Sequence, residues 1–305
     1  MRSAAPNARP MKARADLVAC VAISAVPLAA AVAGLYRFIS VQTARVETTS
    51  VVGVCRIAYR QSMDITGHIG LVAFSTLIVF LLIRSVAAFL RGWRETQRIS
   101  RLEPCTSDSP KWRGVKEFAR TKLPSKPIRL VQADEPMALT VGYWSPQIVL
   151  SSGLLAVLDE TELEAVLRHE SAHVASRDPL KTLITDCCRT ALPFIPAVSY
   201  LADRFRTRKE LEADSAAIES MGSPLPLASA LAKTLAAMPA QTSPGVGLSP
   251  TEARIDALLG RRLPNSNAKL MRVIATSIPA LAVLSVGLYV TASSPHITAL
   301  HICPS

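Results

Sequence analysis

Three stretches of the chain are almost entirely apolar, and each is long enough to form a transmembrane helix. They cover residues 17–38, 69–90 and 270–290. A helix needs about 20 apolar residues to cross the roughly 30 Å hydrocarbon layer of a bilayer. The pattern therefore predicts a mainly α membrane protein. We expect this protein to have an N-terminal membrane region at 1–90, a middle segment at 91–268, and a third span with a short tail at 269–305.

Basic residues gather on one side of each predicted span. The clusters are Arg2, Arg9, Lys12 and Arg14 before the first span, Arg91, Arg94, Arg98 and Arg101 after the second, and Arg261, Arg262, Lys269 and Arg272 at the third. Because cytoplasmic loops carry the excess of Lys and Arg, we expect a multi-pass protein of the cell membrane with a cytoplasmic middle segment. The loop at 39–68 and the tail after Val290 would lie outside. Cleavage of the first span as a signal peptide, at a site such as Ala31-Val32-Ala33, would leave the middle segment cytoplasmic.

The composition argues against other classes of protein. Hydrophobic residues make up 50% of the chain, too many for a disordered protein. The six cysteines lack the CxxC spacing of a cysteine zinc site, and only Cys55 and Cys303 are expected outside, where they could pair. The net charge of +11 includes a basic run at 111–126 with interleaved Trp112 and Phe118. Because this run follows a span, we expect contact with anionic lipid of the bilayer and no direct nucleic-acid partner.

The middle segment is long enough for one domain with its own core. Two short strand-like runs, at 128–131 and 147–150, are separated by turn signals at Gly142 and Ser145-Pro146. Helical patterns then follow at 160–176, which Pro179 is expected to close, and at 197–220, 226–237 and 250–259. We therefore expect an α+β domain in which a small sheet packs on helices.

The helix predicted at 160–176 carries a spacing typical of zinc peptidases. It contains the run His169-Glu170-Ser-Ala-His173, and Asp159 with Glu162 forms a capping-box pattern at its start. At about 100° per residue, His169 and His173 lie one turn apart on one face, where two imidazoles can hold one Zn²⁺. A pair of hydrogen-bonded core histidines is the alternative interpretation.

The glutamate between the histidines lies in the middle of the apolar stripe. On a helical wheel, Glu170 shares its side with Leu163 and Leu167, whereas Glu164 and Arg168 lie on the far side. A buried carboxylate without a partner costs several kcal/mol or loses its charge. The position of Glu170 therefore indicates a metal-bound water or another hydrogen-bond donor beside it.

A later helix offers a candidate third ligand. Glu210 and Asp214 are one turn apart and share a face with Leu211, Ala217 and Ile218. Like charges at this spacing repel each other unless a positive charge lies nearby, which zinc and its histidines would provide. The alternative is a pair on the helix surface. A catalytic zinc needs three protein ligands and an open position.

These residues resemble the gluzincin membrane peptidases, in which Glu-x-x-x-Asp on a later helix follows His-Glu-x-x-His. The closer resemblance is to the BlaR/MecR-type antirepressor metallopeptidases, and the HtpX and CAAX-prenyl-endopeptidase group is the nearest relative. The resemblance covers roughly Ile128 to Leu259. It rests on Met137 to Gly142, Pro146 to Leu150, the helix up to His173, Arg177-Asp178, and Glu210 to Asp214. The resemblance implies a cytoplasmic gluzincin domain with His169, His173 and Glu210 as Zn²⁺ ligands. It also implies Glu170 as general base and Asp214 as an acceptor that orients a ligand histidine.

The resemblance further implies a membrane-anchored zinc-dependent endopeptidase that cuts a cytoplasmic or juxtamembrane protein, such as a transcriptional repressor in BlaR/MecR-like signalling. An HtpX-like quality-control peptidase and a non-catalytic zinc-binding membrane regulator are the alternatives. Residues 291–305 contain no Ser-x-x-Lys, so we expect no β-lactam-binding sensor after the third span. We expect an extended substrate to pair with the edge of the 147–150 strand, and Tyr143 and Tyr200 are candidate oxyanion donors.

Overall fold

The computed structural model describes residues 13–25, 36, 54–105, 109–123, 127–237, 250–261, 271–279 and 282. For 54–75, 78 and 250 it describes the backbone alone. The chain forms two compact units. The first unit comprises 1–17, 88–186 and 201–265, and the second unit comprises 18–87, 187–200 and 266–305. All residues of the predicted zinc site belong to the first unit.

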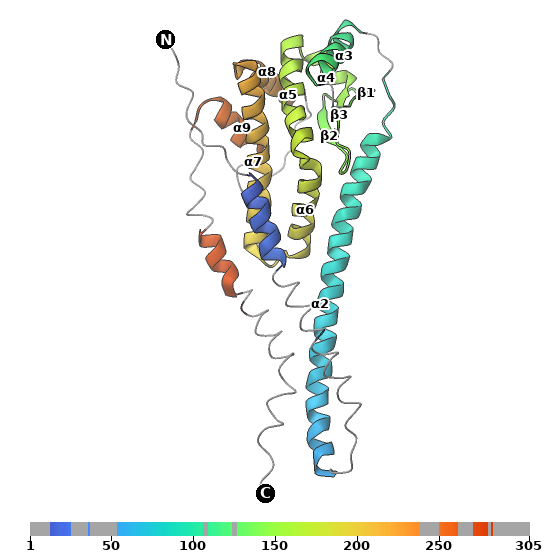
Figure 1. Cartoon of the computed structure of the whole chain (residues 1–305), viewed down its shortest axis with the longest axis vertical. Helices are drawn as coiled ribbons and strands as arrows, with labels where there is room; N and C mark the ends of the chain where they lie inside the picture. Colours follow the sequence, from blue (N-terminus) through green and yellow to red (C-terminus); the bar gives the residue numbers. More distant parts are fainter. Residues whose placement is uncertain are drawn as a thin grey trace. The chain divides into compact units, whose positions relative to one another are not determined.

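The long helix α2 runs from Val54 to Ser100 and contains 47 residues (Figure 1). It begins inside the segment that we predicted as the 39–68 loop, and it includes the whole predicted span at 69–90. Residues 13–25 and 271–279 are also helical, but much of the first and most of the third predicted span lies outside the described residues. In the described ranges, no helix combines the length and the apolar character that crossing a membrane requires. The three spans therefore stay a prediction.

A small mixed sheet lies in the first unit, as predicted. Its strands are β1 (Ile128–Val131), β2 (Ala138–Val141) and β3 (Gln147–Ser151), in the order β1-β3-β2. β1 is parallel to β3, whereas β2 forms an antiparallel hairpin with β3. β3 therefore uses both of its edges inside the sheet. The prediction that a substrate pairs with the edge of the 147–150 strand is wrong, because β1 and β2 already occupy both sides of it.

The two faces of the sheet are covered by different helices. On one face, Ile148 and Leu150 pack with Leu167 of α5 (Glu160–Ser176) in a cluster of eleven buried residues. On the other face, Val149 belongs to a second cluster, against which Ile99 of α2 packs. This division follows from the alternation of side chains along a strand. Figure 1 shows the sheet between α5 and the C-terminal end of α2.

Six further helices are labelled in Figure 1. They are α3 (Pro110–Lys122), α4 (Ser152–Val157), α6 (Asp178–Ala191), α7 (Pro196–Met221), α8 (Leu225–Ala237) and α9 (Pro250–Leu258). The helices predicted from sequence at 160–176, 197–220, 226–237 and 250–259 match α5, α7, α8 and α9 to within one residue at each end. The strand β2 and the helices α4 and α6 were not predicted.

The ends of α5 explain how the site is built. The predicted capping box is confirmed: Asp159 accepts from the Glu162 N–H, and the Glu162 side chain accepts from the Asp159 N–H, both at 2.9 Å. At the other end, Arg177 adopts the left-handed conformation with φ 53°, and α6 starts at Asp178. Pro179 does not close α5. It lies in the first turn of α6, where the missing N–H of a proline costs no intrahelical hydrogen bond.

Candidate metal centre

His169 and His173 lie on the buried face of α5, and Glu210 reaches them from α7. Each of the three offers one ligand atom, and these atoms lie within 4.8 Å of one another. The two Nε2 atoms are 3.2 Å apart, and Glu210 Oε2 lies 3.5 Å from that of His169 and 3.7 Å from that of His173. Among the described residues, this is the one group of three or more such side chains placed to hold a metal ion.

The size of this triangle fits zinc. Bonds from zinc to histidine nitrogen and carboxylate oxygen are about 2.0–2.2 Å, so neighbouring ligand atoms of a tetrahedral site lie about 3.3–3.6 Å apart. The observed separations of 3.2, 3.5 and 3.7 Å are close to that range. The donor set, two imidazoles and one carboxylate, is also one that zinc accepts while keeping a fourth position open.

A carboxylate faces the outer nitrogen of each histidine. Asp178 Oδ2 lies 2.7 Å from His173 Nδ1 in a hydrogen bond. Asp214 Oδ1 lies 2.8 Å from His169 Nδ1 but off the axis of its N–H bond, so that contact is mainly electrostatic. A carboxylate at Nδ1 favours the tautomer that leaves a lone pair on Nε2. Two nitrogen lone pairs and the oxygen of Glu210 then converge on one point, where a cation would stabilise all three.

Without a metal, protons supply this positive charge. Burial lowers the pKa of His173, but hydrogen bonds with Asp178 and Glu210 outweigh it and raise the pKa to about 9. Burial also lowers the pKa of His169, and its contacts with Asp214 and Glu210 again raise it overall. The pKa of Glu210 lies well below its usual range, because both histidines bond to it and outweigh its burial. A bound metal would displace the protons from the two rings.

Arg254 of α9 contacts the carboxylates of Glu210 and Asp214 on α7. Its Nε and Nη2 atoms lie 2.9 and 2.8 Å from the two oxygens of Asp214. Its Nη1 atom lies 3.6 Å from Oε2 of Glu210. A guanidinium group matches a carboxylate in this two-point geometry, which fixes orientation as well as charge. Arg254 therefore orients the acid that faces His169 and lies beside the acid that completes the triangle.

Glu170 is buried one residue after His169, as the helical wheel predicts. The hydroxyl of Thr140 on β2 donates to Glu170 Oε2 at 2.7 Å and lies 3.1 Å from the main-chain carbonyl oxygen of the same residue. The hydrogen-bond donor that the buried position demanded is thus present. Because Thr140 belongs to the sheet and Glu170 to α5, this bond ties the carboxylate to the strand beside it.

Sequence reasoning missed Asp178, Thr140 and Arg254 as members of the site. Asp178 belongs to the Arg177-Asp178 pair of the family resemblance, and its position just after a helix end is the signal that points to it. Arg254 gave no local signal, because its partners Asp214 and Glu210 are 40 or more positions away. Of the two candidate oxyanion donors, Tyr143 packs its hydroxyl against Gly92 of α2, and Tyr200 belongs to the second unit.

Comparison with known proteins finds similarity to proteases. The chain is 30% identical over 162 residues to a protease HtpX homolog of Methylibium petroleiphilum, which covers 42% of this chain and 57% of that protein. It is 36% identical over 103 residues to a protease HtpX homolog of Burkholderia multivorans, with 32% and 35% covered. A protease HtpX homolog of Aquifex aeolicus is 34% identical over 84 residues, with 27% and 28% covered. The chain thus spans less than two thirds of the length of each of these relatives.

A match to a whole family covers much more of the chain. Residues 18–256 match the family described as BlaR1 peptidase M56. That range includes His169, Glu170, His173, Glu210 and Arg254. The resemblance to BlaR/MecR-type and HtpX-type peptidases is therefore confirmed. The chain belongs to the BlaR1 peptidase M56 family.

Proposed function

We propose that this protein is a membrane-anchored zinc endopeptidase, with His169, His173 and Glu210 as the zinc ligands. The observation that carries the proposal is the convergence of two Nε2 atoms and one carboxylate oxygen at 3.2, 3.5 and 3.7 Å, with an acid behind each ring. When bound there, zinc supplies Lewis-acid activation of water and of a peptide carbonyl group.

The chain's own residues supply the proton transfers and the positioning. Glu170 accepts the proton of the attacking water and returns it to the nitrogen of the leaving amine, as a general base and then a general acid. Thr140 holds the Glu170 carboxylate in place through the bond to Oε2. Asp178 and Asp214 keep the histidine rings oriented, which is the role of acids behind metal ligands in many sites.

The sheet supports a mode of substrate binding. Among the described strands, β2 pairs on one side only, with β3, so its outer edge is available for an extended peptide. Main-chain hydrogen bonds along such an edge give affinity with little dependence on side chains. Since Thr140 of β2 contacts Glu170, a peptide on this edge would lie close to the general base. This edge replaces that of the 147–150 strand in the proposed mechanism.

The sequence pattern and the family support a proposal for the anchoring and the substrate. The three apolar stretches and their flanking Arg and Lys residues favour a multi-pass membrane protein with the site in the cytoplasm. We propose a cytoplasmic or juxtamembrane protein as substrate, with a transcriptional repressor as the specific candidate. The family match supports the candidate, since this family is described by the name BlaR1.

Replacement of Glu170 by Gln tests the mechanism. The purified full chain in detergent is assayed for zinc content and for cleavage of casein as a general substrate. Glu170→Gln should keep zinc, because the three ligands are unchanged, and should lose about 10²- to 10⁴-fold in rate. Glu164→Gln is the matched control, because Glu164 pairs with Arg168 on the outer side of the same helix. Equal cleavage by the Glu170→Gln variant and the wild type would remove Glu170 from the mechanism.

A second candidate function is a quality-control peptidase, favoured by the similarity to protease HtpX homologs. Cleavage-site profiling in cells, comparing wild type with Glu170→Gln, separates the two functions. One or a few cleaved proteins would support a signalling peptidase, and many misfolded membrane proteins would support quality control. Full function in cells that carry Glu170→Ala would instead support a non-catalytic zinc-binding regulator.

A further inference from the structure

The hairpin tip between β2 and β3, residues 142–146, exposes a large aromatic side chain. Trp144 is 80% exposed, the highest value among the large hydrophobic residues of the described chain. The tip is a tight turn: Gly142 has φ +98°, and a Cβ atom at this position would lie 2.6 Å from the carbonyl oxygen of Ser145. Trp144 is therefore held in an exposed position by a tight turn.

The hairpin tip packs against α2 at Gly92. The hydroxyl of Tyr143 lies 2.7 Å from where a Cβ atom on Gly92 would be, so the glycine makes room for the ring against the helix. Leu183 of α6 comes within 3.1 Å of the same point. The tip therefore lies beside Gly92 of α2, and Trp144 directly follows Tyr143 in the sequence.

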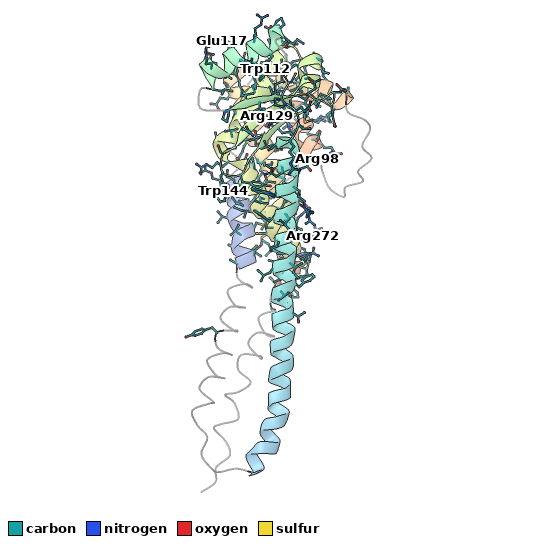
Figure 2. All side chains as sticks on the ribbon, turned by 90° about the vertical axis from the view of Figure 1, so that its right-hand side faces the viewer. Arg98, Trp112, Glu117, Arg129, Trp144 and Arg272 are labelled. Atoms are coloured by element: carbon teal, nitrogen blue, oxygen red, sulfur yellow. The ribbon has the colours of Figure 1, made fainter. Side chains whose placement is uncertain are left out.

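If α2 crosses the bilayer at 69–90, as the sequence predicts, the level of Gly92 is that of a membrane surface. The predicted span ends at Leu90, and Gly92 lies about 3 Å further along a helix that rises 1.5 Å per residue. The interfacial region on each side of the hydrocarbon layer is about 5–8 Å thick. In Figure 2, Trp144 lies toward the end of the first unit at which α2 leaves it, and Trp112 lies toward the opposite end. With this span in the bilayer, the tip would sit at the height of the lipid headgroups.

The stretch of α2 around Gly92 has the composition of an interfacial anchor. Phe89 and Trp93 of α2 stack with ring centroids 6.2 Å apart, and both are 43% exposed. Arg91 and Arg94 are exposed beside them. Tryptophan is enriched at membrane interfaces because its ring is apolar and its N–H is polar, and exposed arginines attract anionic headgroups.

We propose that the hairpin tip inserts into the headgroup region of the bilayer beside α2, with Trp144 as the anchoring side chain. The proposal rests on the proposed membrane anchoring of α2. It adds a lipid contact for the first unit, which carries the proposed zinc site. Thr140 precedes Trp144 by four residues, which span at most about 13 Å, so the outer edge of β2 would be held just above the membrane. The substrate class is then an extended protein segment that lies close to the bilayer.

Depth-dependent quenching of tryptophan fluorescence tests this contact in the full chain. The protein is reconstituted into phosphatidylcholine/phosphatidylglycerol vesicles whose acyl chains carry bromine near the headgroup. Three single-tryptophan proteins are compared: W93F/W112F, which keeps Trp144, W112F/W144F, which keeps Trp93, and W93F/W144F, which keeps the buried Trp112. We expect brominated lipid to reduce the emission of Trp144 and of Trp93 at least twofold and to leave that of Trp112 unchanged.

The outcomes separate the anchor from the proposed function. If Trp93 is quenched and Trp144 is as insensitive as Trp112, the hairpin anchor is overturned and the membrane anchoring of α2 stands. If neither is quenched, both are overturned. Should a double variant fail to fold, the wild-type chain labelled with 5-fluorotryptophan gives the same comparison by ¹⁹F NMR. Nitroxide-labelled lipid should then broaden the resonance of Trp144 and not that of Trp112, and equal broadening of the two would overturn the anchor.

Discussion

The hydrogen bond from Thr140 to Glu170 gives a direct test of how the general base is positioned. Thr140→Val removes the hydroxyl and keeps the branched shape of the side chain, so the packing of β2 changes little. The lost bond is short, at 2.7 Å, and its acceptor is a carboxylate. Hydrogen bonds to charged groups contribute about 1.5–3 kcal/mol, which corresponds to about a 10- to 150-fold change in rate. The loss should appear in kcat more than in KM, because the bond positions a group that acts in the transition state.

The assay measures kcat and KM for cleavage of a fluorogenic peptide, with zinc content determined on the same samples. Thr140→Ser keeps the hydroxyl and should restore most of the rate. Thr121→Val is a matched control, since the hydroxyl of Thr121 is exposed and donates only to the main chain of α3. A Thr140→Val protein with full zinc and the wild-type kcat would refute the argument that this bond positions Glu170.

Two further predictions concern stability. Arg254→Met removes two charge-assisted hydrogen bonds from Asp214, which keeps its contact with His169, and should lower the free energy of unfolding of the chelator-treated protein by about 1.5–3 kcal/mol, measured by urea unfolding. Arg254→Lys should lose less, and an unchanged Arg254→Met protein would show that the pair is not needed. The pKa of Glu162 lies below its ordinary value of 4.5, because the bonds to Lys233 and Ser229 outweigh its burial, so its contribution is present above about pH 4.5 and is lost as the pH falls. The stability difference between wild type and Glu162→Gln should therefore shrink from pH 6 to pH 3, and a constant difference would contradict this assignment.

Local patterns in the sequence determine the helix that carries the histidines. The capping box of Asp159 and Glu162 marks the start of α5, and the apolar stripe places Glu170 on the buried side. These signals act over one to four residues and need no knowledge of the rest of the fold. The spacing of Glu210 and Asp214 on α7 is equally local, which is why the three ligand candidates could be named from sequence.

The contacts that complete the site could not be predicted in this way. Thr140 lies on a strand of four residues, too short for an alternating pattern to stand out. Arg254 meets Asp214 only after the chain has passed through α8. Pro179 was expected to close α5, although a proline is equally at home in the first turn of a new helix. In each case the partner is chosen by packing between elements, which a single helix or strand does not encode.

The two acids behind the histidines differ in how far along the chain they lie. Asp178 follows His173 by five residues, across the left-handed turn at Arg177, whereas Asp214 follows His169 by 45. Closing the longer loop costs about 2 kcal/mol more in chain entropy, since the cost grows with the logarithm of loop length. A nascent chain can therefore set the ring of His173 as soon as α5 and the start of α6 have formed. The ring of His169 can be oriented only once α7 has formed. The set of three metal ligands is therefore complete only after this helix has been synthesised.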